Sequence, residues 1–200
     1  HAFSRFIEKA CAPLTVDIPA RIRDTPHLLE IIDDLNSKEL PSGSILVSFD
    51  IINMFPSIDN GKGIAAVKTA LESRSSKSPS TNCIIEGLHI WLYNSNSKFD
   101  QEHLLQTNGT ATGAPNSCSY SDLAIFTLDK LIDKEHDDNY KEIVFYGRYR
   151  DDCLVLWNGS LDRLDDFFAF LNTLDQDLKF TMEVGNNEVH FLDLKIKIVD

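Results

Sequence analysis

The sequence predicts an α+β fold in which an antiparallel sheet packs on helices. Short apolar runs that end at turn residues predict the strands, and apolar residues at three- and four-residue spacing predict the helices. Their order along the chain is strand, helices, strand pair, helix and strand, which fits the α+β class. The 200 residues, 42% of them hydrophobic, suffice to form one core of this kind.

The first part of the chain predicts two helices and a central strand. Residues 1–12 and 26–38 have helical spacing, and Asp24 and Thr25 are available to cap the second helix. Residues 44–50 (SILVSFD) form a nearly continuous apolar run after the turn signal PSG and end on an acid. Such a run is typical of a strand that is buried on both faces.

The middle of the chain predicts further helices and one small strand pair. Helices at 61–74 and 80–94 are joined by a Ser-rich loop, and a pair of short strands is expected within 98–107. The glycine-bearing segment 108–116 follows. A long, half-buried helix then runs from about Pro115 to Lys134, with the proline near its first turn.

The last part of the chain predicts the rest of the sheet. A strand pair surrounds Asp151 and Asp152, and an amphipathic helix follows at 161–176. Closing strands at 178–184 and 189–196 flank the turn GNN.

The charge of the chain limits the classes of function. A formal net charge of −12 argues against a surface that by itself binds nucleic acid, since such binding depends on Lys and Arg at phosphates. The sequence contains no run of some 18 apolar residues and no signal peptide, so we expect an intracellular protein that makes no membrane contact. Because the chain starts at His1 without an initiator methionine, we also expect it to be a piece of a longer protein.

Two adjacent acids stand inside a predicted strand pair. Asp151 and Asp152 interrupt FYGRYRDDCLVLW (residues 145–157), and Asp50 ends the central strand. Burying neighbouring carboxylates adds a repulsion of roughly 4 kcal/mol in a partly polar site, unless a cation offsets it. If a mixed sheet brings the three acids together, they suit two Mg²⁺ ions, one activating a hydroxyl and one stabilising a leaving pyrophosphate.

Three segments resemble the motifs of a known family. FDIINMFPSI (49–58) resembles reverse-transcriptase motif A, GTATGAPNSCSYSDLAIF (109–126) motif B, and RYRDD (148–152) motif C. The segment before motif A, the GTATG opening of motif B and the tail LKFTMEVGNNEVHFLDLKI resemble Penelope-like retroelement reverse transcriptases more than retroviral ones. All motifs occur in the family's order over nearly the whole chain, which makes the resemblance specific.

The resemblance implies a reverse-transcriptase palm, with a ferredoxin-like antiparallel sheet, and part of the fingers. Residues 1–43 would be fingers and leading helices, and residues 44–200 the palm. Asp50, Asp151 and Asp152 would be the catalytic acids. Two Mg²⁺ ions, or Mn²⁺ in their place, would bind Asp50, Asp151 and the backbone carbonyl of Ile51.

Other positions carry implied roles in substrate binding. Phe55 would exclude a ribose 2′-hydroxyl, and Gly113, Ala114 and Pro115 would form the nucleotide-binding turn of motif B. Tyr149, Arg148 and Arg150 would contact primer or template. Arg150 stands where the family usually keeps a small or apolar residue, so its effect on activity stays open.

Simpler roles compete with each of these. Phe55 is by default a core aromatic, an Asp pair is common in solvated hairpin turns, and arginines on alternate strand positions are normally exposed. No clear lysine of motif D is present, although Lys179 and Lys195 are candidates.

The implied activity is RNA-directed DNA polymerisation in a retrotransposon, with RNA template, DNA primer and dNTPs as partners and the nucleus as the site of integration. Missing fingers, the thumb and any endonuclease domain would belong to the parent chain, and the fragment alone would have little activity. The alternatives are an inert structural or nucleic-acid-binding descendant and an RNA-synthesising polymerase with a similar palm. Template preference, priming and oligomeric state are not determined by the sequence.

Overall fold

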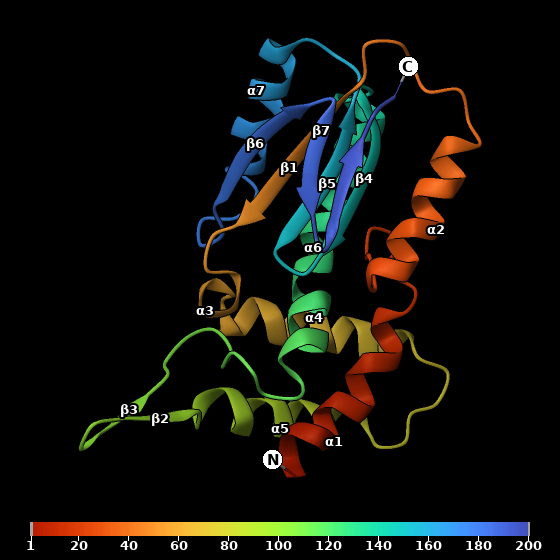
Figure 1. The fold of residues 1–200 in the computed structure, drawn as a ribbon. Helices are drawn as coiled ribbons and strands as arrows, with labels where there is room; N and C mark the ends of the chain where they lie inside the picture. Colours follow the sequence, from red (N-terminus) through yellow and green to blue (C-terminus); the bar gives the residue numbers. More distant parts are fainter. Residues whose placement is uncertain (1, 200) are drawn as a thin grey trace. The chain divides into compact units, whose positions relative to one another are not determined.

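The computed structural model describes residues 2–199, which form two compact units (Figure 1). The first unit contains the segments His1–Pro19 and Asn53–Leu128, and the second contains Ala20–Ile52 and Asp129–Asp200. The boundary expected at residue 43 does not coincide with this division. It remains a prediction about polymerase subdomains rather than about compact units.

A four-stranded antiparallel sheet forms the centre of the second unit, in the order β4-β5-β1-β6 (Figure 1). Its strands are β1 Ile45–Ile51, β4 Ile143–Tyr149, β5 Asp152–Trp157 and β6 Phe180–Asn186. β1 lies between β5 and β6, with Val47, Phe49 and Ile51 buried. This confirms the central strand that the apolar run predicted.

Helix α7 (Leu161–Leu171) covers one face of this sheet. Ser160 caps its first turn by accepting the Arg163 amide. Phe167 packs edge-on against Phe49 at 5.9 Å between ring centroids and stacks on Trp157 at 5.8 Å. The three rings are almost fully buried, so aromatic packing fixes α7 on the sheet.

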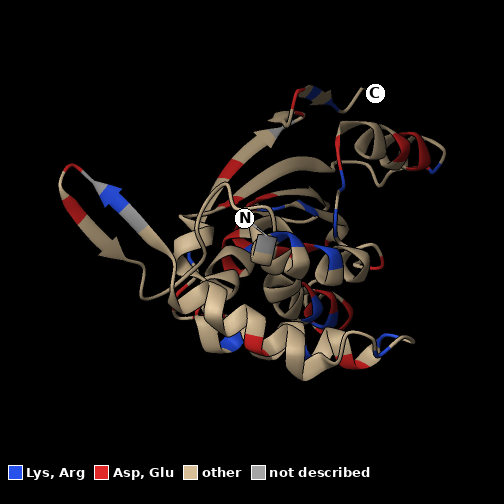
Figure 2. Cartoon of the chain, turned by 90° about the horizontal axis from the view of Figure 1, so that it is seen from below, with Lys and Arg blue, Asp and Glu red and all other residues tan. Residues whose placement is uncertain are grey.

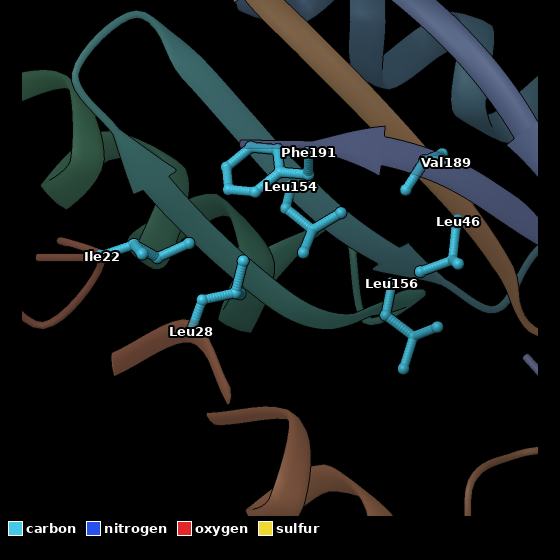
Figure 3. Packing of buried hydrophobic residues seen from close by; sticks show 7 residues of the cluster. All are labelled: Ile22, Leu28, Leu46, Leu154, Leu156, Val189 and Phe191. Carbon is cyan, nitrogen blue, oxygen red and sulfur yellow. The ribbon is translucent and has the colours of Figure 1, made fainter. Parts of the chain in front are cut away.

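A hydrophobic cluster covers part of the other face (Figure 3). In the sheet register Leu46 lies opposite Leu156, and Leu154 is two residues along the same strand, so the three side chains share one face. The other members come from α2 (Thr25–Asn36), β7 (Glu188–Phe191) and the segment before α2; they are Ile22, Leu28, Val189 and Phe191. Asp24 caps α2, as predicted, by accepting the His27 amide at 2.9 Å.

The predicted closing strand at 189–196 is wrong as a single strand. It breaks at Leu192 and Asp193 into β7 and β8 (Leu194–Lys197), which pair with each other so that Val189 faces Ile196. Leu192 has φ +53°, in the left-handed region that bulky residues rarely occupy. The break therefore contains no glycine that the sequence could have shown.

The described part of the first unit is mainly helical. Its elements are α1 Ala2–Cys11, the 3₁₀ helix η1 Ala12–Thr15, α3 Met54–Ser57, α4 Asn60–Ser73, α5 Thr81–Tyr93, and the hairpin of β2 Asn96–Phe99 and β3 Glu102–Leu105. α5 packs on both α1 and α4. Asp59 and Ser80 cap α4 and α5 through the amides of Lys62 and Cys83. Helix α6 (Ser117–Asp138) contributes residues to both units.

Charged residues are interspersed along the ribbon in Figure 2. The described segments therefore include no helix or strand that is basic throughout, in keeping with the net charge of −12. Among residues 2–199, every helix is too short or too polar to span a lipid bilayer.

Candidate functional site

The register of β1 and β5 brings two acids together. Asp50, the penultimate residue of β1, lies directly opposite Asp152, the first residue of β5. Directly opposite residues on antiparallel strands place their Cβ atoms about 4.5–5.5 Å apart on one face. The two carboxylates, 102 positions apart in sequence, are thus neighbours.

The third acid lies in the turn that joins β4 to β5. Arg150 and Asp151 form a two-residue loop, since Tyr149 pairs with Asp152. The Asp151 carbonyl accepts the Ile51 amide at 3.0 Å, which ties this loop to the end of β1. The structure therefore brings together the three acids that the sequence singled out, while their roles as catalysts and metal ligands remain predictions.

Two of the three carboxylates, Asp50 and Asp152, have raised pKa values. Burial raises the pKa of Asp50, and the charge of Asp151 raises it further. Burial, then the charges of Asp151 and Asp50, also raises the pKa of Asp152. A divalent cation would reverse these shifts by favouring the ionised forms.

The carboxylates of Asp50, Asp151 and Asp152 suit a metal site whose remaining ligands come from water and substrate, rather than a site built from protein side chains alone. Among residues 2–199, no three His, Cys, Asp or Glu side chains form a ready-made cage. Mg²⁺ prefers carboxylate oxygens and keeps several waters and substrate phosphates in its shell, so it does not require such a cage. Clustered carboxylates with raised pKa values at an open pocket match that preference.

A pocket of about 500 Å³ opens beside Asp50 and Asp152. β6 contributes Thr181, opposite Asp50, and Glu183, opposite Ser48, and the turn after β7 contributes Leu192. Sequence reasoning missed Thr181 and Glu183. The alternation of polar and apolar residues in LKFTMEV could have shown that the two share a face, but not that this face carries the acids.

Arg148 does not lie on an exposed strand face, so that expectation is wrong. Its side chain is fully buried and ion-paired with buried Asp129: Nη2 donates to Oδ2 at 2.8 Å and Nε donates to Oδ1 at 3.0 Å. Its Nη1 also donates to the Arg150 carbonyl at 2.9 Å. This buried ion pair connects the β4–β5 hairpin to α6, and it occupies the guanidinium of Arg148, which therefore cannot reach a phosphate.

The other two residues of the predicted primer contact lie nearer the surface. Tyr149 is half-buried and packs against the hydrophobic cluster, while Arg150 is exposed with its guanidinium 5.0 Å from the centre of the Tyr149 ring. Arg150 has φ +58°, which costs a non-glycine residue about 1 kcal/mol. The roles of both residues at a primer remain predictions.

The nucleotide-binding residues expected in motifs A and B belong to the first unit. Phe55 is half-buried in α3, and its carbonyl accepts the Thr110 amide at 2.8 Å. Gly113 has φ +86°, with open space where a Cβ would stand, and α6 begins at Ser117, just after Ala114 and Pro115. The predicted glycine turn before the helix is therefore present, while its contact with a nucleotide stays a prediction.

Both candidate lysines of motif D have partners. Lys179 Nζ donates to the Asn172 carbonyl at 3.0 Å, beyond the end of α7, and Lys195 Nζ pairs with Glu188 at 2.6 Å. Neither contact points to a role at the acids.

No protein-family model matches the sequence, and no curated protein matches it. The fold, however, is similar to that of solved polymerases. A telomerase from Candida albicans, in complex with a fragment of telomeric RNA, matches with a TM-score of 0.74 and 14% identity over 98% of this chain and 37% of that one. Apo telomerase from Candida tropicalis, truncated at its C-terminal domain, matches with a TM-score of 0.71 and 16% identity over 98% and 43%.

An RNA-dependent RNA polymerase matches with a TM-score of 0.67 and 10% identity, over 96% of this chain and 20% of that one. The chain thus spans less than half the length of these polymerases. At such identities the likeness concerns the fold. The chain has a reverse-transcriptase-like polymerase fold, with an antiparallel palm sheet packed on helices.

Proposed function

We propose that this chain is the palm, with part of the fingers, of an RNA-directed DNA polymerase from a Penelope-like retroelement. The observation that supports this best is the geometry of the three acids. Asp50 faces Asp152 across two strands, and Asp151 occupies a loop tied to the end of β1, within a sheet of polymerase-like fold.

The proposed reaction joins a deoxynucleotide to a primer. The primer 3′-oxygen attacks the α-phosphorus of the dNTP, the bond from that phosphorus to the oxygen of the β-phosphate breaks, pyrophosphate leaves, and the hydroxyl proton passes to solvent water. Two bound Mg²⁺ ions would lower the pKa of that hydroxyl and neutralise the leaving group. Asp50, Asp151 and the Ile51 carbonyl would hold these ions, and Asp152 would supply the nearby third carboxylate.

Residues of the first unit would select the nucleotide. Phe55 would pack on the sugar and exclude a 2′-hydroxyl, which favours dNTPs over rNTPs. Gly113 has no side chain to obstruct a base pair, and with Ala114 and Pro115 it would form the turn against which the pair rests.

The partners in this proposal are an RNA template and a DNA primer, with Tyr149 and Arg150 on the primer side. The chain spans only 37% and 43% of the two telomerases, so further fingers, a thumb and any endonuclease domain would belong to the longer parent. Much of the phosphate contact would come from those segments, which accounts for an acidic palm. The nucleus is the expected location.

RNA synthesis is a second candidate, because RNA-dependent RNA polymerases share the fold. Phe55 argues against it, since an RNA polymerase must admit the ribose 2′-hydroxyl. A catalytically inert descendant is the third candidate; the cation at Arg150 and the acidic surface are the features that favour it.

Primer extension by the parent protein tests the proposal. The assay supplies Mg²⁺, a primed RNA template and either dNTPs or rNTPs, and compares the intact protein with Asp151→Asn. Asp165→Asn on the exposed side of α7 is the control that matches the change in charge. We expect dNTP incorporation by the intact protein and the control, and none by Asp151→Asn. Equal background in all three would indicate an inert module, and preference for rNTPs an RNA polymerase.

A further inference from the structure

Beneath the turn that carries Asp151 lies a buried polar network. Arg148, Asp129 and Tyr146 form it within the second unit; Arg148 and Asp129 are buried, and Tyr146 is half-buried. The relative exposure is 0% for Arg148 and 3% for Asp129. Burying an ion pair does not by itself stabilise a fold, because desolvation offsets much of the attraction. Its presence below the acids therefore calls for a reason other than stability.

Both carboxylate oxygens of Asp129 accept hydrogen bonds from the other two residues of the network. Asp129 accepts from Arg148 Nε and Nη2 on its two oxygens, and its Oδ1 also accepts from the Tyr146 hydroxyl at 2.9 Å. Burial and the Asp129 charge hold the pKa of Tyr146 well above its usual range, so its hydroxyl stays protonated and donates. Asp129 is thus held from two sides, and it fixes the plane of the guanidinium.

The backbone of Arg148 is fixed as well. Its amide donates to the Ala20 carbonyl at 2.6 Å, and its carbonyl accepts the Ile22 amide at 2.7 Å, so residues 20–22 close the free edge of β4. The side chain of Arg148 also reaches the loop through Nη1. It donates to the carbonyl of Arg150, inside the loop.

That loop needs such a constraint. Arg150 occupies the left-handed region at φ +58°, an unfavourable conformation for a residue with a side chain. Its carbonyl belongs to the peptide that joins it to Asp151, so fixing this carbonyl orients the backbone of Asp151. On its other side the Asp151 carbonyl accepts the Ile51 amide at 3.0 Å.

We infer that Arg148, oriented by Asp129, is a positioning residue that sets the conformation of the Arg150–Asp151 loop and thereby aims the Asp151 carboxylate for catalysis. This inference rests on the proposed polymerase function for its catalytic part only. The placement of the loop is a property of the folded chain and can be measured without substrate.

Two variants separate positioning from charge and from stability. Arg148→Lys keeps the cation beside Asp129, but one ammonium cannot contact both carboxylate oxygens and the Arg150 carbonyl in the same planar fork. The triple variant Asp129→Leu/Arg148→Met/Tyr146→Phe replaces the network by apolar side chains of similar size, which is often neutral or stabilising. Tyr146→Phe alone is the control, since it removes one contact to Asp129 and leaves the bond from Arg148 to the loop.

The first readout is hydrogen exchange at two backbone amides. The Ile51 amide reports the loop, because it donates to Asp151, whereas the Val155 amide at the centre of β5 reports global opening. In Arg148→Lys and the triple variant we expect exchange at Ile51 to rise at least about tenfold relative to Val155, with no such rise in Tyr146→Phe. Equal acceleration at both amides, or none, would overturn the inference.

The second readout is single-nucleotide primer extension by the parent protein. Arg148→Lys and the triple variant should lower kcat about 10- to 100-fold, the usual cost of losing a group that orients a catalytic ligand. The KM values for dNTP and primer should stay within about threefold, because no binding contact is lost. If the apolar triple variant keeps full kcat, the network only fills space in the core and does not position Asp151. If the intact protein extends no primer, the polymerase proposal fails, while the exchange data still decide the placement of the loop.

Discussion

Asp50 on β1 and Asp152 on β5 lie directly opposite each other in the sheet register. Like charges in this relationship destabilise an antiparallel pair, and Asp151 adds a third carboxylate in the adjacent loop. The chain thus concentrates repulsion at one end of its central strand. Such an arrangement is expected where a cation binds, and it leads to measurable consequences for stability.

The pH dependence of stability follows from the pKa values of two of these acids. Both Asp50 and Asp152 have folded-state pKa values above the ordinary 3.8. The folded chain therefore holds these protons more tightly than the unfolded chain. Their contribution to stability is complete below pH 3.8 and is lost as the pH rises through the folded-state values.

Other acids, such as Glu142 and Glu188, have lowered pKa values and act in the opposite sense. The prediction therefore concerns the difference in unfolding free energy between the intact chain and Asp50→Asn in EDTA. Asp50→Asn should become the more stable of the two as the pH rises from 4 to 7, measured by urea unfolding. A constant difference over this range would show that Asp50 does not experience the repulsion.

Added Mg²⁺ should stabilise the folded chain through the same acids. At a concentration ten times the dissociation constant, a ligand of the folded state adds about 1.4 kcal/mol, or roughly 3–6 °C in Tm for a chain of this size. Asp50→Asn should lose most of this shift, whereas Asp165→Asn should keep it. Thermal unfolding with and without Mg²⁺ measures the effect, and identical shifts in all three proteins would assign the ion to another place.

Phe55→Val tests the choice of sugar. A smaller side chain would leave room for a 2′-hydroxyl, so the preference for dNTP over rNTP in kcat/KM should fall about 10- to 100-fold. Phe168→Val, which truncates another half-buried ring that stacks on Phe49, serves as the control and should leave the ratio unchanged. An unaltered ratio in Phe55→Val would make that ring a packing residue.

The two glycines of motif B should respond differently to alanine. Gly113 has φ +86° with open space around it, so Gly113→Ala should cost about 1–2 kcal/mol of backbone strain alone. Gly109 has φ +72°, and a Cβ there would collide with the backbone of Pro56, so Gly109→Ala should cost about 2–5 kcal/mol. Urea unfolding of both variants measures this order. If polymerisation occurs, Gly113→Ala should lose more activity than its small loss of stability explains.

Local patterns determined most of the elements. The apolar run at 44–50 predicted the central strand β1, and the helical spacing of LDRLDDFFAFL predicted α7. The acids of motifs A and C also lie at or beside the ends of predicted strands, Asp50 in the first motif and Asp151 and Asp152 in the other. These features depend on residues close in sequence, so periodicity and turn signals suffice to find them.

Non-local packing decided the rest. Arg148 on a strand with alternate arginines suggests an exposed face, yet Asp129, nineteen positions away on α6, and the edge segment 20–22 bury it. Likewise Leu192 and Asp193 turn the chain between β7 and β8 without a glycine, because pairing within the hairpin and packing on the cluster compensate the unfavourable φ of Leu192. A sequence records which side chains alternate, whereas burial depends on which distant segment covers each face, and that is settled only when the chain packs.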